Sequence, residues 1–133
     1  AYRIAEALTT KDTKVAVYTG DQTDDEREQA RLDFVMGRAQ YLVGTIAALG
    51  TGVDGLQHAT RHVIFVDQDP VYDNNRQAIG RLWRMGQTGG VNVWVIAARD
   101  TVDDDLAESL RAQADMKERL TGARWRELTG GPA

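Results

Sequence analysis

Apolar and polar positions along the chain predict strands and helices that follow one another in turn. Short β-branched runs predict strands at 14–18 (KVAVY), 41–44, 61–66 (RHVIFV) and 91–97 (VNVWVIA). Apolar residues at helical spacing predict helices at 1–8, 24–36, 74–85 and 102–120. Alternation of this kind is typical of an α/β fold, with a mainly parallel sheet and helices on both of its faces.

Local polar residues predict where several of these helices begin. Thr23 and Glu26 have the spacing of a capping box, in which each side chain bonds the backbone amide of the other. Asp73 or Asn74 is a candidate cap for the helix that runs to about Met85. The segment 101–104 (TVDD) predicts a further helix start, with its acids at the positive end of the helix dipole.

The segment 45–56 is rich in glycine and follows the second predicted strand. Residues 50–55 (GTGVDG) match the dinucleotide-binding pattern G-x-G-x-x-G. We reject a nucleotide-dependent oxidoreductase, because the glycines do not directly follow the strand and only 56–60 could form the crossover helix. The glycines are expected either to expose backbone amides to a phosphate or to shape a turn.

Composition narrows the class of protein. The 133 residues are 42% hydrophobic and 27% charged, as in one soluble domain, and no apolar run is long enough to cross a membrane. The absence of cysteine excludes thiolate metal sites and disulfides, and no metal site is predicted. The chain carries a net charge of −4, yet residues 74–99 contain four arginines and no acid. This basic segment predicts a focused anion site, and the alternative is an ordinary solvated helix face.

The segment Gln77–Gln87 (QAIGRLWRMGQ) supplies the candidate chemistry. On a helix, Gln77, Arg81 and Arg84 fall at i, i+4 and i+7, within one narrow stripe. Forked guanidinium donors at this spacing match the oxygen atoms of a triphosphate. Gly80 costs about 1 kcal/mol in a helix interior, so we expect something to approach the backbone there. An exposed helix that carries two arginines is the alternative.

The apolar residues of this segment have a separate role. One adjoining stripe is expected to pack on the sheet, namely Ala78, Leu82 and Met85. Trp83 and Trp94 are also expected to pack rather than to stack on nucleic-acid bases, and Trp125 has no assigned role.

The two segments, in this order, resemble motifs V and VI of superfamily-two helicases. The family's motif VI reads roughly Q-A-x-x-R-x-x-R-x-G-Q, and Gln77–Gln87 fits every fixed position. Thr45–Asp54 is similar to motif V, with a threonine, small residues and a final G-[hydrophobic]-[D/N]. Asp69-Pro70, followed by Asn74 or Asn75, is similar to the D-P-x-x-N-P region that precedes motif VI in SWI/SNF-like DNA translocases.

This resemblance extends over about residues 14–120 and implies a fold and an activity. The fold is a RecA-like three-layer domain over 1–120, with its first strand missing upstream, followed by a C-terminal tail over 121–133. The activity is that of the second motor lobe of an ATP-dependent DNA helicase or translocase. The implied location is intracellular, either cytoplasmic, nucleoid-associated or nuclear.

The family's roles for motif VI apply to three residues. Arg84 corresponds to the arginine finger that reaches the γ-phosphate of ATP across the cleft between two lobes. Arg81 corresponds to its catalytic companion, and Gln77 to an amide that helps to bind ATP.

Motif V and the segment after motif IV add four implied roles. Gly52 and Asp54 correspond to the ATP-binding turn, and Asp54 could alternatively be a turn-forming side chain. Thr45 and Gly20 correspond to positions that contact the nucleic-acid backbone, and Thr45 could alternatively be a helix cap.

The sequence lacks two parts that ATP hydrolysis needs. It contains no G-x-x-x-x-G-K-[ST] loop and no D-E-x-H strand end. The resemblance therefore implies an N-terminal RecA-like lobe, on the same or a separate chain, that holds Mg²⁺ and most of the ATP. This chain alone is expected to be inactive. DNA is its second expected partner, beside the N-terminal lobe. The alternative is a stand-alone, non-catalytic docking or nucleic-acid-binding module that complements a separate lobe.

Overall fold

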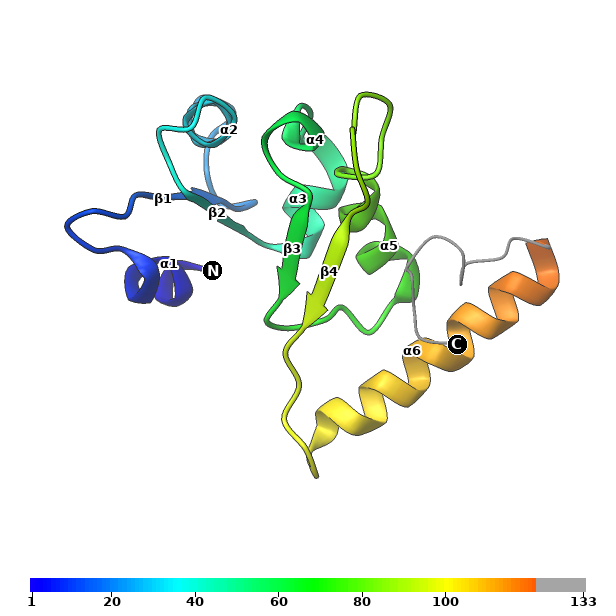
Figure 1. The fold of residues 1–133 in the computed structure, drawn as a ribbon. Coiled ribbons are helices and arrows are strands. Elements are labelled where there is room, and N and C mark those ends of the chain that lie inside the picture. The colour runs from blue at the N-terminus through cyan, green and yellow to red at the C-terminus, as the bar shows by residue number, and fades with distance from the viewer. Residues whose placement is uncertain (122–133) are drawn as a thin grey trace.

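The computed structural model describes residues 1–121, with side chains to Arg119, so the predicted tail from 122 on and Trp125 lie outside it. Helices and strands alternate along most of the chain (Figure 1). In order they are α1 (Tyr2–Leu8), β1 (Val15–Tyr18), α2 (Asp24–Val35), β2 (Tyr41–Gly44), α3 (Ile46–Gly52), α4 (Leu56–Ala59), β3 (His62–Phe65), α5 (Tyr72–Gly80), β4 (Asn92–Val95) and α6 (Val102–Thr121).

Strands β1 and β2 form one parallel ladder, from Val15 opposite Tyr41 to Tyr18 opposite Gly44. Helices α1 and α2 lie on opposite sides of this ladder (Figure 1). The main apolar cluster lies between this ladder and α2, α3 and α4, and its buried members are Tyr18, Ala48, Val53 and Leu56. Val53 is fully buried at its centre, so the chain just after α3 is anchored in the core.

Strands β3 and β4 form a second parallel ladder, with Ile64 opposite Trp94 and Phe65 opposite Val95. Phe65 is buried, whereas the residues that alternate with it lie exposed on the other face. Those exposed apolar residues are Ile64, Val66, Trp94 and Ile96.

The predicted α/β class and parallel pairing are thus confirmed, and the sheet itself differs in one respect. The described strands form two separate two-stranded ladders rather than one continuous sheet. Helices lie on both faces of the β1–β2 ladder. One face of the β3–β4 ladder is instead left uncovered by the described residues, so its apolar side chains are exposed. Within residues 1–121 no backbone hydrogen bonds join the two ladders, which is why the sheet is interrupted.

The predicted helix starts are confirmed for α2 and α6. The Thr23 hydroxyl accepts from the Glu26 amide, and the Glu26 carboxylate accepts from the Thr23 amide at 2.8 Å. The bonds that the Glu26 carboxylate accepts from the Thr23 amide and hydroxyl lower the pKa of Glu26, because they stabilise its ionised form. Helix α6 begins at Val102, where the Thr101 hydroxyl accepts from the Asp103 amide. No helix among the described residues is long and apolar enough to cross a membrane.

The predicted start and end of the helix over 74–85 are wrong. Helix α5 begins at Tyr72 after Val71, which makes no side-chain cap, so neither Asp73 nor Asn74 is the N-cap. The buried Asn75 instead accepts from the Asp69 amide at 2.9 Å and donates to the Asp69 carbonyl at 2.7 Å. These bonds tie the loop after β3 to the helix, and the helix ends at Gly80 in a series of turns.

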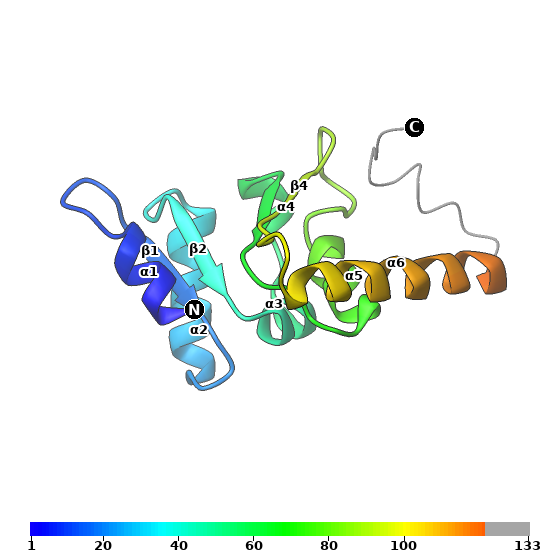
Figure 2. The ribbon, with the colours of Figure 1, turned by 90° about the horizontal axis from the view of Figure 1, so that it is seen from below.

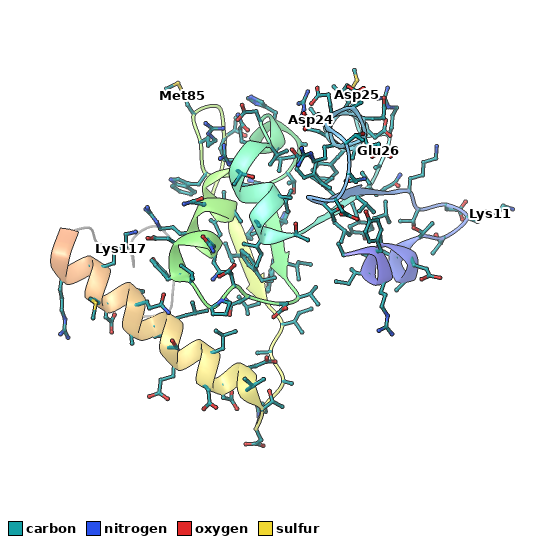
Figure 3. The ribbon with its side chains drawn as sticks, turned by 180° about the vertical axis from the view of Figure 1, so that it is seen from behind. Lys11, Asp24, Asp25, Glu26, Met85 and Lys117 are labelled. Atoms are coloured by element: carbon teal, nitrogen blue, oxygen red, sulfur yellow. The ribbon has the colours of Figure 1, made fainter. Side chains whose placement is uncertain are left out.

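The long helix α6 passes beside the start of α5 (Figures 1 and 2), and polar contacts join the two helices. Gln113 accepts from the Tyr72 amide at 3.0 Å and donates to the Pro70 carbonyl at 2.9 Å. Lys117 of α6, which is labelled in Figure 3, pairs with Asp73 of α5. The bond from Lys117 lowers the pKa of Asp73.

The Asp73–Lys117 pair predicts an acid-sensitive contact between α5 and α6. Because the folded-state pKa of Asp73 is depressed, its contribution to stability is present above the unfolded pKa of about 3.9 and is lost as pH falls through the folded value. We expect the difference in free energy of unfolding between the chain and Asp73→Asn to be constant above about pH 5 and to shrink in more acidic solution. Urea titrations at several pH values measure this difference, with Asp12→Asn as a control from an exposed loop. A difference that does not change between pH 5 and pH 2 would contradict the prediction.

Candidate functional site

The predicted motif V and motif VI segments meet where α3 packs against α5. The glycine-rich segment 45–56 is mostly helix, because Gly50 and Gly52 both lie within α3, so neither glycine shapes a turn. Gly50 is buried, and a Cβ atom at Gly50 would lie 3.7 Å from the Cβ atom of Gln77 on α5. A Cβ atom at Gly50 would be in ordinary van der Waals contact with Gln77, and the packing of α3 on α5 brings Gln77 to the end of α3.

Arg81 is fixed against α3 by a backbone acceptor. Its Nε donates to the Gly50 carbonyl at 3.0 Å, and its Nη2 donates to the same oxygen. The Arg81 side chain is 24% exposed, so part of the guanidinium still faces solvent. A group held in this way loses little rotational freedom when it binds an anion.

Arg84 and Arg81 converge on the carboxylate of Asp54. Arg84 Nη1 donates to Asp54 Oδ1, and Arg81 Nη1 lies 4.0 Å from the same oxygen. The Asp54 side chain therefore faces the arginines, and the alternative that it forms a local turn is wrong. Helix α5 ends before Arg84, so the two arginines meet through the turns after Gly80 rather than through a continuous helical stripe.

This cluster of Asp54, Arg81 and Arg84, which we call the arginine cluster, has the chemistry of an anion site. The Arg84 side chain is 42% exposed and that of Asp54 is 77% exposed, so a ligand can reach both. Two partly exposed guanidiniums offer forked donors to phosphate oxygens. Gly52 ends α3 beside this cluster and is exposed.

Thr45 and Gly20 lie together at the carboxyl ends of the β1–β2 ladder. The Thr45 amide donates to the Tyr18 carbonyl at 3.3 Å, which joins the start of α3 to the end of β1. The Thr45 hydroxyl accepts from the Ala48 amide at 3.4 Å, so the alternative reading as a helix cap is confirmed. Thr45 is also exposed, and its contact with nucleic acid stays a prediction.

Gly20 is exposed, and a Cβ atom there would have open space around it. Its neighbour Asp21 has a lowered pKa, because the hydroxyls of Thr19 and Tyr2 bond its carboxylate. The carboxylate next to Gly20 thus stays ionised at neutral pH, which would disfavour a phosphate close to that side chain.

One expectation for the motif VI segment is wrong, and another finds no partner within the described chain. Within the described residues nothing lies within 4 Å of a Cβ placed on Gly80, which ends α5, so the expected close approach to the backbone there stays a prediction. Ala78 and Leu82 are buried as predicted, but Met85 is 97% exposed and points away from the fold (Figure 3). The turns after α5 rotate Met85 out of the apolar stripe.

The two tryptophans with predicted packing roles are more exposed than expected. Trp83 is 47% exposed on the turn after α5, and Trp94 is 61% exposed on the open face of β4. Both lose the predicted shielding for a structural reason, since α5 ends early and the described part of the chain leaves that face of β3–β4 uncovered.

The sequence did not reveal two residues that hold this site. The Gly50 carbonyl is a backbone acceptor, so no side-chain pattern marks it. Arg31 on α2 donates from Nη1 to the Asp54 carbonyl at 3.2 Å, across 23 positions of sequence. Glu28 binds Arg31 and raises its pKa.

No group of three or more potential metal ligands occurs among the residues that the structure describes. The arginine cluster itself offers two guanidiniums that can bind an anion, with the Asp54 carboxylate as their present partner.

Comparison with known proteins identifies relatives for most of the chain. The family described as the helicase conserved C-terminal domain matches residues 1–86. The probable ATP-dependent RNA helicase DDX4 of Homo sapiens is 41% identical over 71 residues, which are 53% of this chain and 9% of that protein. The protein of the same name from Rattus norvegicus is 38% identical over 93 residues, 68% of this chain and 12% of its own length. This chain thus spans about a tenth of the curated relatives it matches.

A solved structure confirms the fold. The crystal structure of the C-terminal part of the Fun30 ATPase domain superposes with a TM-score of 0.72 over 80% of this chain and 34% of the other, at 23% identity. The predicted RecA-like lobe is therefore confirmed at the level of the fold.

Proposed function

Because this chain belongs to the helicase conserved C-terminal domain family, we propose that it is the second motor lobe of an ATP-dependent DNA translocase of the SWI/SNF-like group. The observation that carries the proposal is the arginine cluster. Arg84 pairs with Asp54, which lies 30 positions away in the sequence, and Arg81 lies beside them. All three side chains are partly exposed, on a surface that a second lobe can face. In this role Arg84 binds the γ-phosphate of ATP, and Arg81 supports it from the Gly50 carbonyl.

The rest of the ATP site is assigned to neighbouring residues and to the other lobe. Gln77 and Gly52 flank the arginine cluster at the end of α3, and Asp54 contributes to the ATP-binding turn. The N-terminal lobe holds Mg²⁺, which neutralises charge on the phosphates during transfer. In the absence of that lobe the chain has no phosphate-binding loop, so we expect it to be inactive by itself.

Helix α3 gives a physical route from ATP to nucleic acid. Thr45 caps the first turn of this helix, and the arginine cluster holds its last turn through Gly50. Seven residues of helix separate the two ends by about 10 Å. A movement of the arginines on ATP binding would therefore shift the Thr45 end, where Thr45 and Gly20 are proposed to contact the DNA backbone.

A second candidate function differs in the nucleic acid. The relatives at 41% identity are described as RNA helicases, which favours RNA as the partner of this lobe. The proposal of DNA rests on the resemblance of the motifs to those of SWI/SNF-like DNA translocases, whereas the Fun30 ATPase domain, at 23% identity, supports the fold alone. Both candidates share the same ATP chemistry.

The test is ATP turnover by the whole natural protein that contains this chain, measured with duplex DNA, with single-stranded RNA and without nucleic acid. Stimulation by duplex DNA above RNA supports the proposal, and stimulation by RNA alone replaces it with the second candidate. The 133-residue chain, assayed in parallel, should show no turnover. An absence of ATP turnover under all conditions would reject the motor altogether.

A further inference from the structure

Asp54 has a backbone that the fold fixes on three sides. The preceding residue, Val53, is fully buried in the core. The following residue, Gly55, has a φ of +87°, a backbone conformation that residues other than glycine rarely adopt. Arg31 of α2 donates to the Asp54 carbonyl at 3.2 Å. The backbone position of Asp54 is therefore set by the core and by α2, without a contribution from Arg81 or Arg84.

The Asp54 carboxylate is itself an anion that faces Arg84 and Arg81. Asp54 Oδ1 accepts from Arg84 Nη1, while Arg81 Nη1 lies 4.0 Å away. The two arginines differ in what else holds them, since Arg81 also binds the Gly50 carbonyl. Arg84 has Asp54 as its charged partner among the described residues.

We propose that Asp54 is an internal competitor for the anion that the arginine cluster binds. In the chain without nucleotide the Asp54 carboxylate occupies the Arg84 guanidinium, and a phosphate must displace it. This inference rests on the proposed function, because it takes the arginines to be the phosphate-binding groups. Competition of this kind lowers the apparent affinity for phosphate, because only the fraction of chains in which Arg84 is not paired with Asp54 can bind it.

The structure also explains why the ion pair between Asp54 and Arg84 is weak enough for a phosphate to displace the carboxylate. Both side chains are substantially exposed, at 77% for Asp54 and 42% for Arg84. Exposed ion pairs contribute little, and salt screens them. A polyphosphate with several negative charges therefore outcompetes one carboxylate. Arg81 keeps its place on the Gly50 carbonyl while Arg84 changes partner, so only one side chain has to move.

The test uses inorganic tripolyphosphate as the probe and the 133-residue chain as the protein. Tripolyphosphate has no sugar or base, so a direct contact of Asp54 with a nucleoside cannot affect the result. We expect Asp54→Asn to bind tripolyphosphate about two to five times more tightly at low salt, the range that an exposed ion pair gives. Calorimetric titration measures the affinity, and circular dichroism checks that each variant is folded.

Asp24→Asn is the matched control. Asp24 is also an exposed aspartate in an ion pair with an arginine, Arg27, and its substitution changes the net charge equally. We expect Asp24→Asn to bind as the parent chain does. An equal gain in tripolyphosphate affinity in both variants, or no gain in Asp54→Asn, would overturn the proposal that Asp54 competes with the anion. A gain that survives when Arg84→Gln is added to Asp54→Asn would also overturn it, because the anion would then bind elsewhere.

A failure of the proposed function would look different. If Arg84→Gln leaves ATP turnover of the whole protein unchanged, the motor role of Arg84 is wrong. The tripolyphosphate titration, in contrast, reports on the competition between Asp54 and an anion with no reference to turnover. The two measurements can therefore fail independently.

Discussion

Replacement of Arg84 by alanine in the whole two-lobe protein should lower ATP turnover by about 10³–10⁵-fold, the range known for arginine fingers. The reason is electrostatic, since the guanidinium neutralises charge that develops on the phosphates in the transition state. The fall should appear in kcat at saturating ATP and saturating nucleic acid. Arg84 is 42% exposed and lies outside the core, so we expect the variant to fold normally.

Arg76→Ala is the control for this experiment. Arg76 is an exposed arginine on α5 that pairs with Asp73 at 3.5 Å, away from the arginine cluster. Its removal takes away the same charge from the same segment, and we expect turnover close to that of the parent protein. Similar turnover for both variants and the parent would show that Arg84 is not the arginine finger.

Replacement of Gly44 by alanine should destabilise the fold by about 1–3 kcal/mol, the typical effect of an overpacked site. A Cβ atom at Gly44 would lie 2.6 Å from the Tyr18 carbonyl oxygen and 2.8 Å from Cγ of Leu49. The first of these neighbours is backbone, so the β1–β2 ladder has to separate or shift to make room. Urea denaturation followed by circular dichroism gives the change in free energy of unfolding.

Gly90→Ala is the matched substitution for comparison. Gly90 lies before β4, and nothing is within 4 Å of a Cβ atom placed there. Its backbone is also outside the left-handed region, so alanine should leave stability nearly unchanged. If Gly44→Ala were no more destabilising than Gly90→Ala, the close approach of β2 to β1 and α3 would be wrong.

The sequence predicted the strands and most helices because their signals are local. The β-branched runs at 15–18 and 62–65 and the capping box at Thr23 need no distant partner to be recognised. The end of α5 could not be predicted in this way. The apolar and charged periodicity continues past Gly80, and the chain turns there while Arg81 reaches the Gly50 carbonyl on another helix.

The candidate site was predicted through its residue types, and its connections were not. The spacing of Arg81 and Arg84 indicated an anion site, yet nothing in the sequence pairs Arg84 with Asp54 or places Arg31 on the Asp54 carbonyl. Those contacts join segments 23 to 30 positions apart, and they depend on how α2, α3 and α5 pack. The motif resemblance carried the assignment of roles, which remains a proposal for each residue.

The division of the strands into two ladders has a consequence for how the chain opens. Ala16 and Tyr18 of β1 are buried, and Tyr18 belongs to the main apolar cluster, whereas no residue of β4 is buried. Native-state hydrogen exchange should therefore find the slowest amides in the β1–β2 ladder and faster exchange in β4. Helix α3 packs against both Tyr18 and α5, and so it couples two units of unequal stability. An anion that orders the end of α3 should therefore slow amide exchange most in the less stable ladder, β3–β4.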